Sequence, residues 1–156
     1  MNLNIIIIII LLIIIALLSN NNKKDKEIDF NKFYKKEYIM TQTELKFYRE
    51  LKKITDELDL TIFPQVDLER IINVKNNENA YRNRIKSRSI DYTVVNNINC
   101  KIICCIELDD YTHNQYNRIK RDEFIDKLFK NVNIKLYRYN LKTDIETIKN
   151  DIRECI

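Results

Sequence analysis

The sequence predicts a mixed α/β domain with the element order α-β-β-β-α-β-α, preceded by an N-terminal transmembrane helix. Two observations carry this prediction. An uninterrupted apolar run occupies residues 5–18, and beyond it the hydrophobic pattern alternates between helical and strand-like periods. Two strand-like segments joined by a turn precede a strand-helix-strand unit, so the strands are expected to form a mixed sheet flanked by helices.

Length and composition limit the class of protein. The chain has 156 residues, which allows one compact domain, and 45% of them are hydrophobic, which excludes intrinsic disorder. A single long apolar run excludes a polytopic membrane protein, and four cysteines in 156 residues exclude a disulfide-stapled miniprotein. The net charge of +4 gives mild support for an anionic partner.

The N-terminal segment is expected to anchor the chain in a lipid bilayer through residues 3–18. Residues 1–22 carry no charged side chain, and a helix over 3–18 would cover roughly 24 Å of a bilayer core of about 30 Å. A cleaved signal peptide is the alternative, but the segment lacks a basic start and a small-residue cleavage site. The lysines that follow place the rest of the chain on the cytoplasmic side by the positive-inside rule. We therefore predict an anchor at 1–22 and a polar tether at 23–37.

The four cysteines agree with a cytoplasmic domain. No CxxC pair is present, and no second cluster of metal ligands accompanies them in the sequence, so a zinc site is not expected. Buried, reduced thiols that act as small hydrophobic side chains are the expectation for a cytosolic compartment. The cysteines are Cys100, Cys104, Cys105 and Cys155.

A helix, a strand, a helical turn and a loop are expected in the first half of the domain. Thr41 and Glu44 have capping-box spacing, and apolar residues recur after them at steps of three and four, which indicates a helix with one buried face. Residues 60–66 are strand-like, and their proline indicates an edge strand or a strand end. A helical turn at 67–74 and an Asn-rich loop at 76–80 follow.

The second half of the domain alternates strands and helices. The strand expected at residues 100–108 is nearly all apolar and β-branched, as expected of a central strand that is buried on both faces. We expect a strand at 90–95, a turn at 96–99, a strand at 100–108, a helix at 118–132, a strand at 134–139 and a helix at 143–155.

Carboxylates collect where two neighbouring strands are expected to lie side by side. Asp91 begins one strand, and Glu107, Asp109 and Asp110 end the next. Like charges this close repel and raise one another's pKa unless a cation lies among them. Hard oxygen ligands select Mg²⁺ or Mn²⁺, which activate water and offset charge on a phosphate. Glu107 and Asp109 are expected on the same side of the sheet, and His113 beyond them has a pKa suited to proton transfer.

The order of these motifs resembles the PD-(D/E)XK nuclease superfamily. The closer resemblance is to the bacterial family called domain of unknown function 2726, which is related to short-patch-repair-like endonucleases. It covers roughly residues 38–140, and it implies a restriction-endonuclease-like sheet within a nuclease-like domain at residues 38–156. An apolar anchor ahead of the domain also fits the family. The matching segments are residues 43–51, 63–66, 83–91, 106–113 and 121–124.

The resemblance implies roles for the site residues. Asp91 and Glu107 would be the metal ligands, for Mg²⁺ or Mn²⁺, and the backbone carbonyl of Leu108 would supply another ligand. Glu44 would project from the first helix, and Gln65 from the first strand, towards the same pocket.

One position departs from the superfamily pattern. Asp109 stands where the motif has its lysine, so Asp109 or His113 is left to manage protons. The apolar run and the resemblance together imply a membrane-anchored, Mg²⁺-dependent nuclease-like domain that hydrolyses DNA, or else RNA. The missing lysine motivates a second hypothesis, a nucleic-acid-binding module of the same fold that has lost hydrolysis. A membrane-anchored protein-interaction domain is the third.

The register of the two strands decides whether the two proposed ligands meet. With a four-residue turn at 96–99, Asp91 lies opposite Cys104, three residues and about 10 Å short of Glu107. A bulge or a longer loop would shift the register and join the two carboxylates at one metal.

A row of cations precedes the first carboxylate. Arg82, Arg84, Lys86 and Arg88 alternate with other residues, so in an extended segment they line one side and suit a phosphate backbone. A row of solvated charges without a ligand is the alternative.

The acidic and histidine candidates also have plain structural interpretations. The alternative for Asp91 and Glu107 is that they are the polar ends of strands, and Glu44 fits equally well as half of a capping box. Asp109 and His113 are equally explained as turn residues.

Overall fold

The computed structural model describes residues 2–20, 28–109 and 116–156, without the side chains of residues 3, 16–20, 77 and 116–120. The chain divides into two compact units, Met1–Glu37 and Tyr38–Ile156. Each unit is described by itself.

In the first unit, Leu3–Asn20 form helix α1 and Phe30–Lys32 form the 3-10 turn η1. The side chains of residues 7–15 of α1, all isoleucine or leucine, are exposed. In the part of the chain that the structure describes, no helix combines the length and the apolar character needed to cross a membrane. The transmembrane span therefore remains a prediction.

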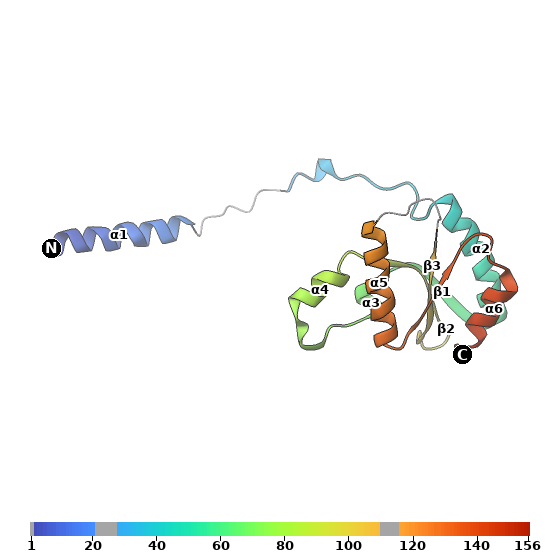
Figure 1. Ribbon diagram of the computed structural model, residues 1–156. Coiled ribbons are helices and arrows are strands. Elements are labelled where there is room, and N and C mark those ends of the chain that lie inside the picture. The colour runs from blue at the N-terminus through green and yellow to red at the C-terminus, as the bar shows by residue number, and fades with distance from the viewer. Residues whose placement is uncertain (1, 21–27, 110–115) are drawn as a thin grey trace. The chain divides into compact units, whose positions relative to one another are not determined.

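The second unit is built on a mixed four-stranded sheet in the order β1-β2-β3-β4 (Figure 1). β1 pairs with β2 and β2 with β3 in antiparallel fashion, while β3 and β4 are parallel. The mixed α/β class is thus confirmed, and so are the edge position of the proline-containing strand and the interior position of the apolar one. The strands are β1 (Leu60–Asp67), β2 (Ser89–Asn96), β3 (Ile102–Leu108) and β4 (Lys135–Tyr139).

Helices cover both faces of this sheet (Figure 1). On one face lie α2 (Gln42–Glu57) and α6 (Ile145–Arg153). On the other lie α3 (Leu68–Ile71), α4 (Asn79–Ile85) and α5 (Tyr116–Asn131). The short turn η2 (Lys75–Asn77) precedes α4.

Helix α2 begins with the predicted capping box. The Glu44 N–H donates to Thr41 Oγ1 at 3.2 Å, and the Thr41 N–H donates to Glu44 Oε2 at 2.6 Å. These two bonds satisfy two of the backbone donors that the first turn of a helix leaves free. They also fix one carboxylate oxygen of Glu44, while its other oxygen points elsewhere.

Each face of the sheet carries its own hydrophobic cluster. Beneath α2 and α6 the cluster includes Leu51, Tyr92 and Ile152, and beneath α3, α4 and α5 it includes Cys105 and Phe129. All five are at most 2% exposed, so both faces are fully covered along the middle of the sheet.

The expectation of buried thiols is confirmed for Cys104 and Cys105, which are fully buried. Burial raises the pKa of Cys105 to about 12, so this thiol is protonated at neutral pH and acts as a small hydrophobic side chain. Cys155 is half-buried, and the expectation is wrong for Cys100, which is exposed in the turn between β2 and β3.

The predicted extended row of cations is wrong, because part of it is helical. α4 occupies Asn79–Ile85, where the sequence predicts the end of a loop and an extended segment. Arg82 and Arg84 are two residues apart on this helix, and with 3.6 residues per turn they face nearly opposite sides. Lys86 ends the helix, and Arg88 follows it just before β2. The four cations do not form one line.

Candidate functional site

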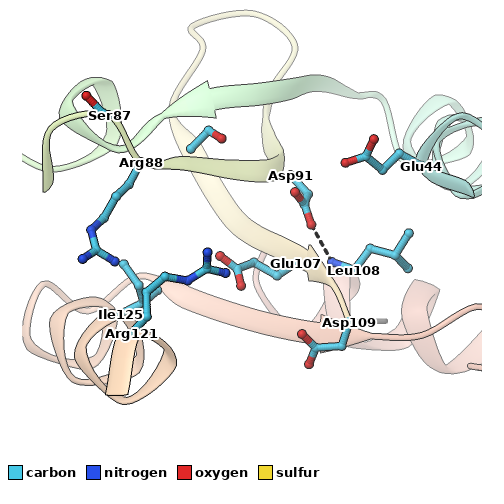
Figure 2. Close-up of a pocket in the computed structure, with 10 residues that line it drawn as sticks. Glu44, Ser87, Arg88, Asp91, Glu107, Leu108, Asp109, Arg121 and Ile125 are labelled. Atoms are coloured by element: carbon cyan, nitrogen blue, oxygen red, sulfur yellow. Dashed lines mark hydrogen bonds between the residues drawn. The ribbon is translucent and has the colours of Figure 1, made fainter. Parts of the chain in front are cut away.

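The pairing of β2 with β3 brings the two predicted metal ligands together. Tyr92 pairs with Ile106, so the next residues in this register, Asp91 and Glu107, lie opposite each other at the end of β3. Directly opposite residues share a face of the sheet, with Cβ atoms about 5 Å apart. Figure 2 shows both carboxylates on the wall of one pocket. The expected pairing of Asp91 with Cys104 is wrong.

A longer loop and a bulge together cause this shift. Val95 pairs with Ile102, which is two residues later than a four-residue turn would allow. Val94 then pairs with Cys104 rather than with Ile103, so one residue of β3 bulges out and the register moves by one more residue. These two changes account for the three residues that separated Asp91 from Glu107 in the predicted register.

Asp91 is held by two hydrogen-bond donors. The backbone N–H of Leu108 donates to Asp91 Oδ2 at 2.9 Å, and the side-chain amide of Gln65 donates to Oδ1 at 3.3 Å. Burial raises the pKa of Asp91 and the negative charge of Glu44 adds to this, while the two hydrogen bonds counteract it. The result is a fixed carboxylate whose ionised form is destabilised by its surroundings.

Gln65 connects two other predicted site residues, Glu44 and Asp91, with Ser89. Its amide nitrogen donates to Glu44 Oε1 at 3.1 Å as well as to Asp91, and its amide oxygen accepts a bond from Ser89 Oγ at 3.2 Å. Gln65 has a φ of 51°, in the left-handed region, which costs a residue other than glycine about 1–2 kcal/mol. This backbone conformation occurs within β1, directly after Pro64, and the hydrogen bonds of the site hold it in place.

Glu107 faces a cation that the sequence analysis missed. Arg138 on β4 pairs with Glu107 in the parallel register, and Arg138 Nη1 lies 2.6 Å from Glu107 Oε2. The same nitrogen lies 3.6 Å from Asp109 Oδ1, which confirms that Glu107 and Asp109 point to the same side of the sheet. Burial raises the pKa of Glu107, and Arg138 offsets part of this effect.

Arg138 is bound by a third carboxylate, on α5. Its Nη2 lies 3.0 Å from Asp126 Oδ1, and its Nε donates to the same oxygen at 3.3 Å. Burial alone lowers the pKa of Arg138, but Glu107, Asp126 and Asp109 together raise it, so this side chain is always charged. In the sequence Arg138 is only a single cation between two tyrosines of β4. Its contact with Glu107 can be recognised only when β3 is known to lie beside β4.

The carboxylates line a pocket of about 350 Å³ (Figure 2). Arg88 and Arg121 line the same pocket, and Arg121 extends towards Glu107 in Figure 2. The charge of Arg121 lowers the pKa of both Asp91 and Glu107, although burial outweighs it. Arg88 stacks over the Phe124 ring, 5.5 Å from its centre. The pocket therefore combines acidic and basic side chains at the end of the sheet, where residues of α2 and of α5 both line it.

A second cavity of about 490 Å³ adjoins the first. Both are lined by Glu44, Leu108 and Asp109, so these residues form the boundary between two hollows. Thr41 and Lys142 line the second one. Glu44 and Asp109 thus lie between the two cavities, whereas Asp91 and Glu107 line the first one.

The donor atoms of the pocket suit a hard divalent cation. Within the described residues no group of three or more His, Cys, Asp or Glu side chains is arranged to hold a metal. Mg²⁺, however, usually keeps several waters and is held by one or two carboxylates, which Asp91 and Glu107 supply. The further candidates Asp110 and His113 lie outside the described residues. Asp91 and Glu107 therefore fit Mg²⁺ as a partial ligand set that solvent or substrate would complete.

The fold and the pocket define a mixed α/β protein with a carboxylate pair on neighbouring strands. The chain belongs to the family described as Protein of unknown function (DUF2726), whose model matches residues 36–156. The family indicated by the sequence motifs is thereby confirmed. No curated protein and no solved structure matches the chain.

Proposed function

We propose that residues 38–156 form a Mg²⁺-dependent nuclease that hydrolyses phosphodiester bonds of DNA, or else of RNA, on a PD-(D/E)XK-like core. The observation that carries this proposal is the convergence of Asp91 and Glu107, which lie in neighbouring strands and line one pocket with two arginines. Partly desolvated carboxylates favour a divalent cation, and arginines favour phosphate. A pocket with both kinds of side chain suits a metal and a phosphodiester together.

In this proposal Asp91 and Glu107 bind the metal. Mg²⁺, when bound, offsets the negative charge of the phosphate and activates water. The Leu108 N–H and the Gln65 amide hold Asp91 in one orientation through the bonds described above. Glu44 in turn accepts a bond from Gln65, so its role is to position Gln65 and, through it, Asp91.

Other side chains of the pocket would bind the substrate and move protons. Arg88 and Arg121 provide positive charge for the phosphate backbone. Asp109, which takes the motif lysine's place, is 39% exposed and has the access to water that a proton carrier requires. His113 is the second candidate for that step and lies outside the described residues.

A nucleic-acid-binding module without hydrolysis is the second candidate function. The specific observation that favours it is the ion pair between Arg138 and Glu107, which places a protein cation where the first proposal needs a metal. The absence of the motif lysine favours it too. In this case the pocket arginines would bind phosphate, and the carboxylates would only position them.

One assay separates the two functions. The full chain, purified in a mild detergent, is incubated with supercoiled plasmid and either Mg²⁺, Mn²⁺ or excess chelator. We expect nicking with either metal and none with the chelator. Binding that weakens steeply with salt but never leads to nicking would support the second function, because phosphate contacts release counterions. A chain that neither binds nor nicks DNA or RNA contradicts both.

We also propose that the N-terminal segment attaches the chain to a membrane, with residues 38–156 on the cytoplasmic side. The support is the apolar run at residues 5–18, the exposed apolar side chains of α1 and the lysines that follow. The full chain is expected to stay with a membrane pellet during alkaline carbonate extraction, whereas residues 38–156 alone should remain in the supernatant. A full chain that carbonate extracts would contradict the anchor.

A further inference from the structure

Arg138 supplies a positive charge within the carboxylate site through its ion pair with Glu107. Its side chain is 22% exposed and that of Glu107 is 14% exposed, so the ion pair between them is largely shielded from water. The N···O distance of 2.6 Å is that of a strong charge-assisted hydrogen bond. Two half-buried carboxylates on neighbouring strands repel each other, and Arg138 provides the opposite charge that this part of the sheet requires.

Arg138 and a divalent cation would compete for the same carboxylate. A hydrogen bond from Nη1 occupies Oε2 of Glu107, and the guanidinium places a full positive charge next to any ion that Glu107 and Asp91 share. Two cations this close in a partly buried site repel strongly. A metal that binds Glu107 through Oε2 therefore requires Arg138 to move away from that oxygen.

The structure provides a place for Arg138 to go. Asp126, on α5, already accepts two bonds from the guanidinium, and Asp109 lies 3.6 Å away. Their side chains are 57% and 39% exposed, compared with 14% for Glu107. Arg138 could thus keep its partner on the solvent side while releasing the buried one.

We propose that Arg138 is a built-in competitor of the metal: it holds Glu107 when no divalent cation is bound and transfers to Asp126 and Asp109 when one binds. This inference rests on the proposed metal-dependent function and adds a regulatory role for a residue of the same site. It explains how the carboxylate pair is stable without a metal, and it raises the metal concentration at which half of the sites are occupied.

The proposal predicts opposite effects for two substitutions. Arg138→Met removes the competitor, so Mn²⁺ should bind roughly tenfold more tightly or better. Asp126→Asn removes the carboxylate that receives the displaced guanidinium, so Mn²⁺ should bind a few-fold more weakly. Arg153→Met is the matched control, because this exposed arginine lies on α6, which covers the other face of the sheet. This variant should leave Mn²⁺ affinity unchanged.

Isothermal titration of the full chain with Mn²⁺ alone measures these affinities without any reaction. Thermal melting with and without Mn²⁺ checks folding, and Mn²⁺ should raise the melting temperature of Arg138→Met more than that of the parent chain. Where Arg138→Met does not fold, the weaker binding by the surface variant Asp126→Asn still tests the proposal.

Three results would overturn the exchange. They are equal or weaker Mn²⁺ binding by a folded Arg138→Met, unchanged or tighter binding by Asp126→Asn, and no binding by any variant. The last result, together with no nicking of plasmid, also refutes the metal-dependent function. Nicking by the parent chain combined with unchanged affinities in both variants refutes the exchange alone.

Discussion

Replacing Asp91 by Asn, or Glu107 by Gln, is expected to lower Mg²⁺-dependent DNA cleavage by roughly a hundredfold to a thousandfold. Each substitution keeps the shape of the side chain and removes its negative charge, so the metal loses one of the two carboxylates proposed to hold it. Metal-ion catalysis contributes several kcal/mol of charge stabilisation to a reaction, and each 1.4 kcal/mol corresponds to a factor of about ten in rate. The loss of either carboxylate alone should therefore be enough to cause this decrease in cleavage rate. The initial rate of plasmid nicking measures it.

Asp56→Asn is the matched control for this experiment. Asp56 is a carboxylate on the surface of α2, 56% exposed and paired with Lys52, and its loss should leave cleavage unchanged. Cleavage that survives in both Asp91→Asn and Glu107→Gln would mean that any hydrolysis takes place elsewhere. Equal loss in the Asp56 variant would mean that the assay reports overall charge rather than the site.

The stability of Asp91→Asn should depend on pH in a way that tests the burial of this carboxylate. Burial raises the pKa of Asp91 above its ordinary value of 3.8, so ionisation destabilises the folded state. The penalty is present at neutral pH, shrinks as the pH falls through the raised pKa, and is absent well below 3.8. The difference in melting temperature between Asp91→Asn and the parent chain should therefore favour the variant more at neutral pH than at a pH well below 3.8.

Truncating Phe129 to Ala is expected to destabilise residues 38–156 by about 3–5 kcal/mol. Phe129 lies on α5, is 1% exposed and packs in the cluster that contains Cys105. Its removal leaves a cavity between α5 and the sheet, and α5 is the helix that carries Arg121 and Asp126 to the site. Because small domains are stable by only about 5–15 kcal/mol, this loss approaches the whole margin. Urea unfolding measures the change in the free energy of unfolding.

Ile98→Ala is the control for this truncation. Ile98 is 88% exposed in the loop between β2 and β3, so removing its side chain should change the free energy of unfolding by no more than about 0.5 kcal/mol. A Phe129→Ala variant as stable as Ile98→Ala would show that α5 does not pack on the sheet as described.

Most of the secondary structure follows from local patterns. The capping box of Thr41 and Glu44 marks the start of α2, and the apolar segment around Cys104 and Cys105 indicates a buried interior strand. Helix α4 is the exception, because its residues Asn79–Ile85 have a polar, Asn-rich start and no clear amphipathic period. A single buried side chain, Ile85, joins α4 to the cluster, and one apolar position is too weak a signal for a helix.

The site depends more on tertiary pairing than on local sequence. Asp91 and Glu107 are recognisable as strand-end carboxylates. Their position opposite each other depends on a loop and a bulge that the sequence of residues 96–103 does not predict. Arg138 is further removed, because its contact with Glu107 exists only through the parallel pairing of β3 with β4. That pairing joins segments separated by a whole helix.

By itself the sequence determined the family, the mixed α/β class, the apolar N-terminal run and the residue types gathered near the end of β3. These properties are local or cumulative, since each rests on the chemistry of nearby side chains. Only the tertiary structure decided that Asp91 faces Glu107, that Gln65 links Glu44 to Asp91, and that Arg138 already neutralises Glu107. Side chains alternate along a strand, so a shift of one residue sends them to the opposite face, and no local pattern specifies the register to that accuracy.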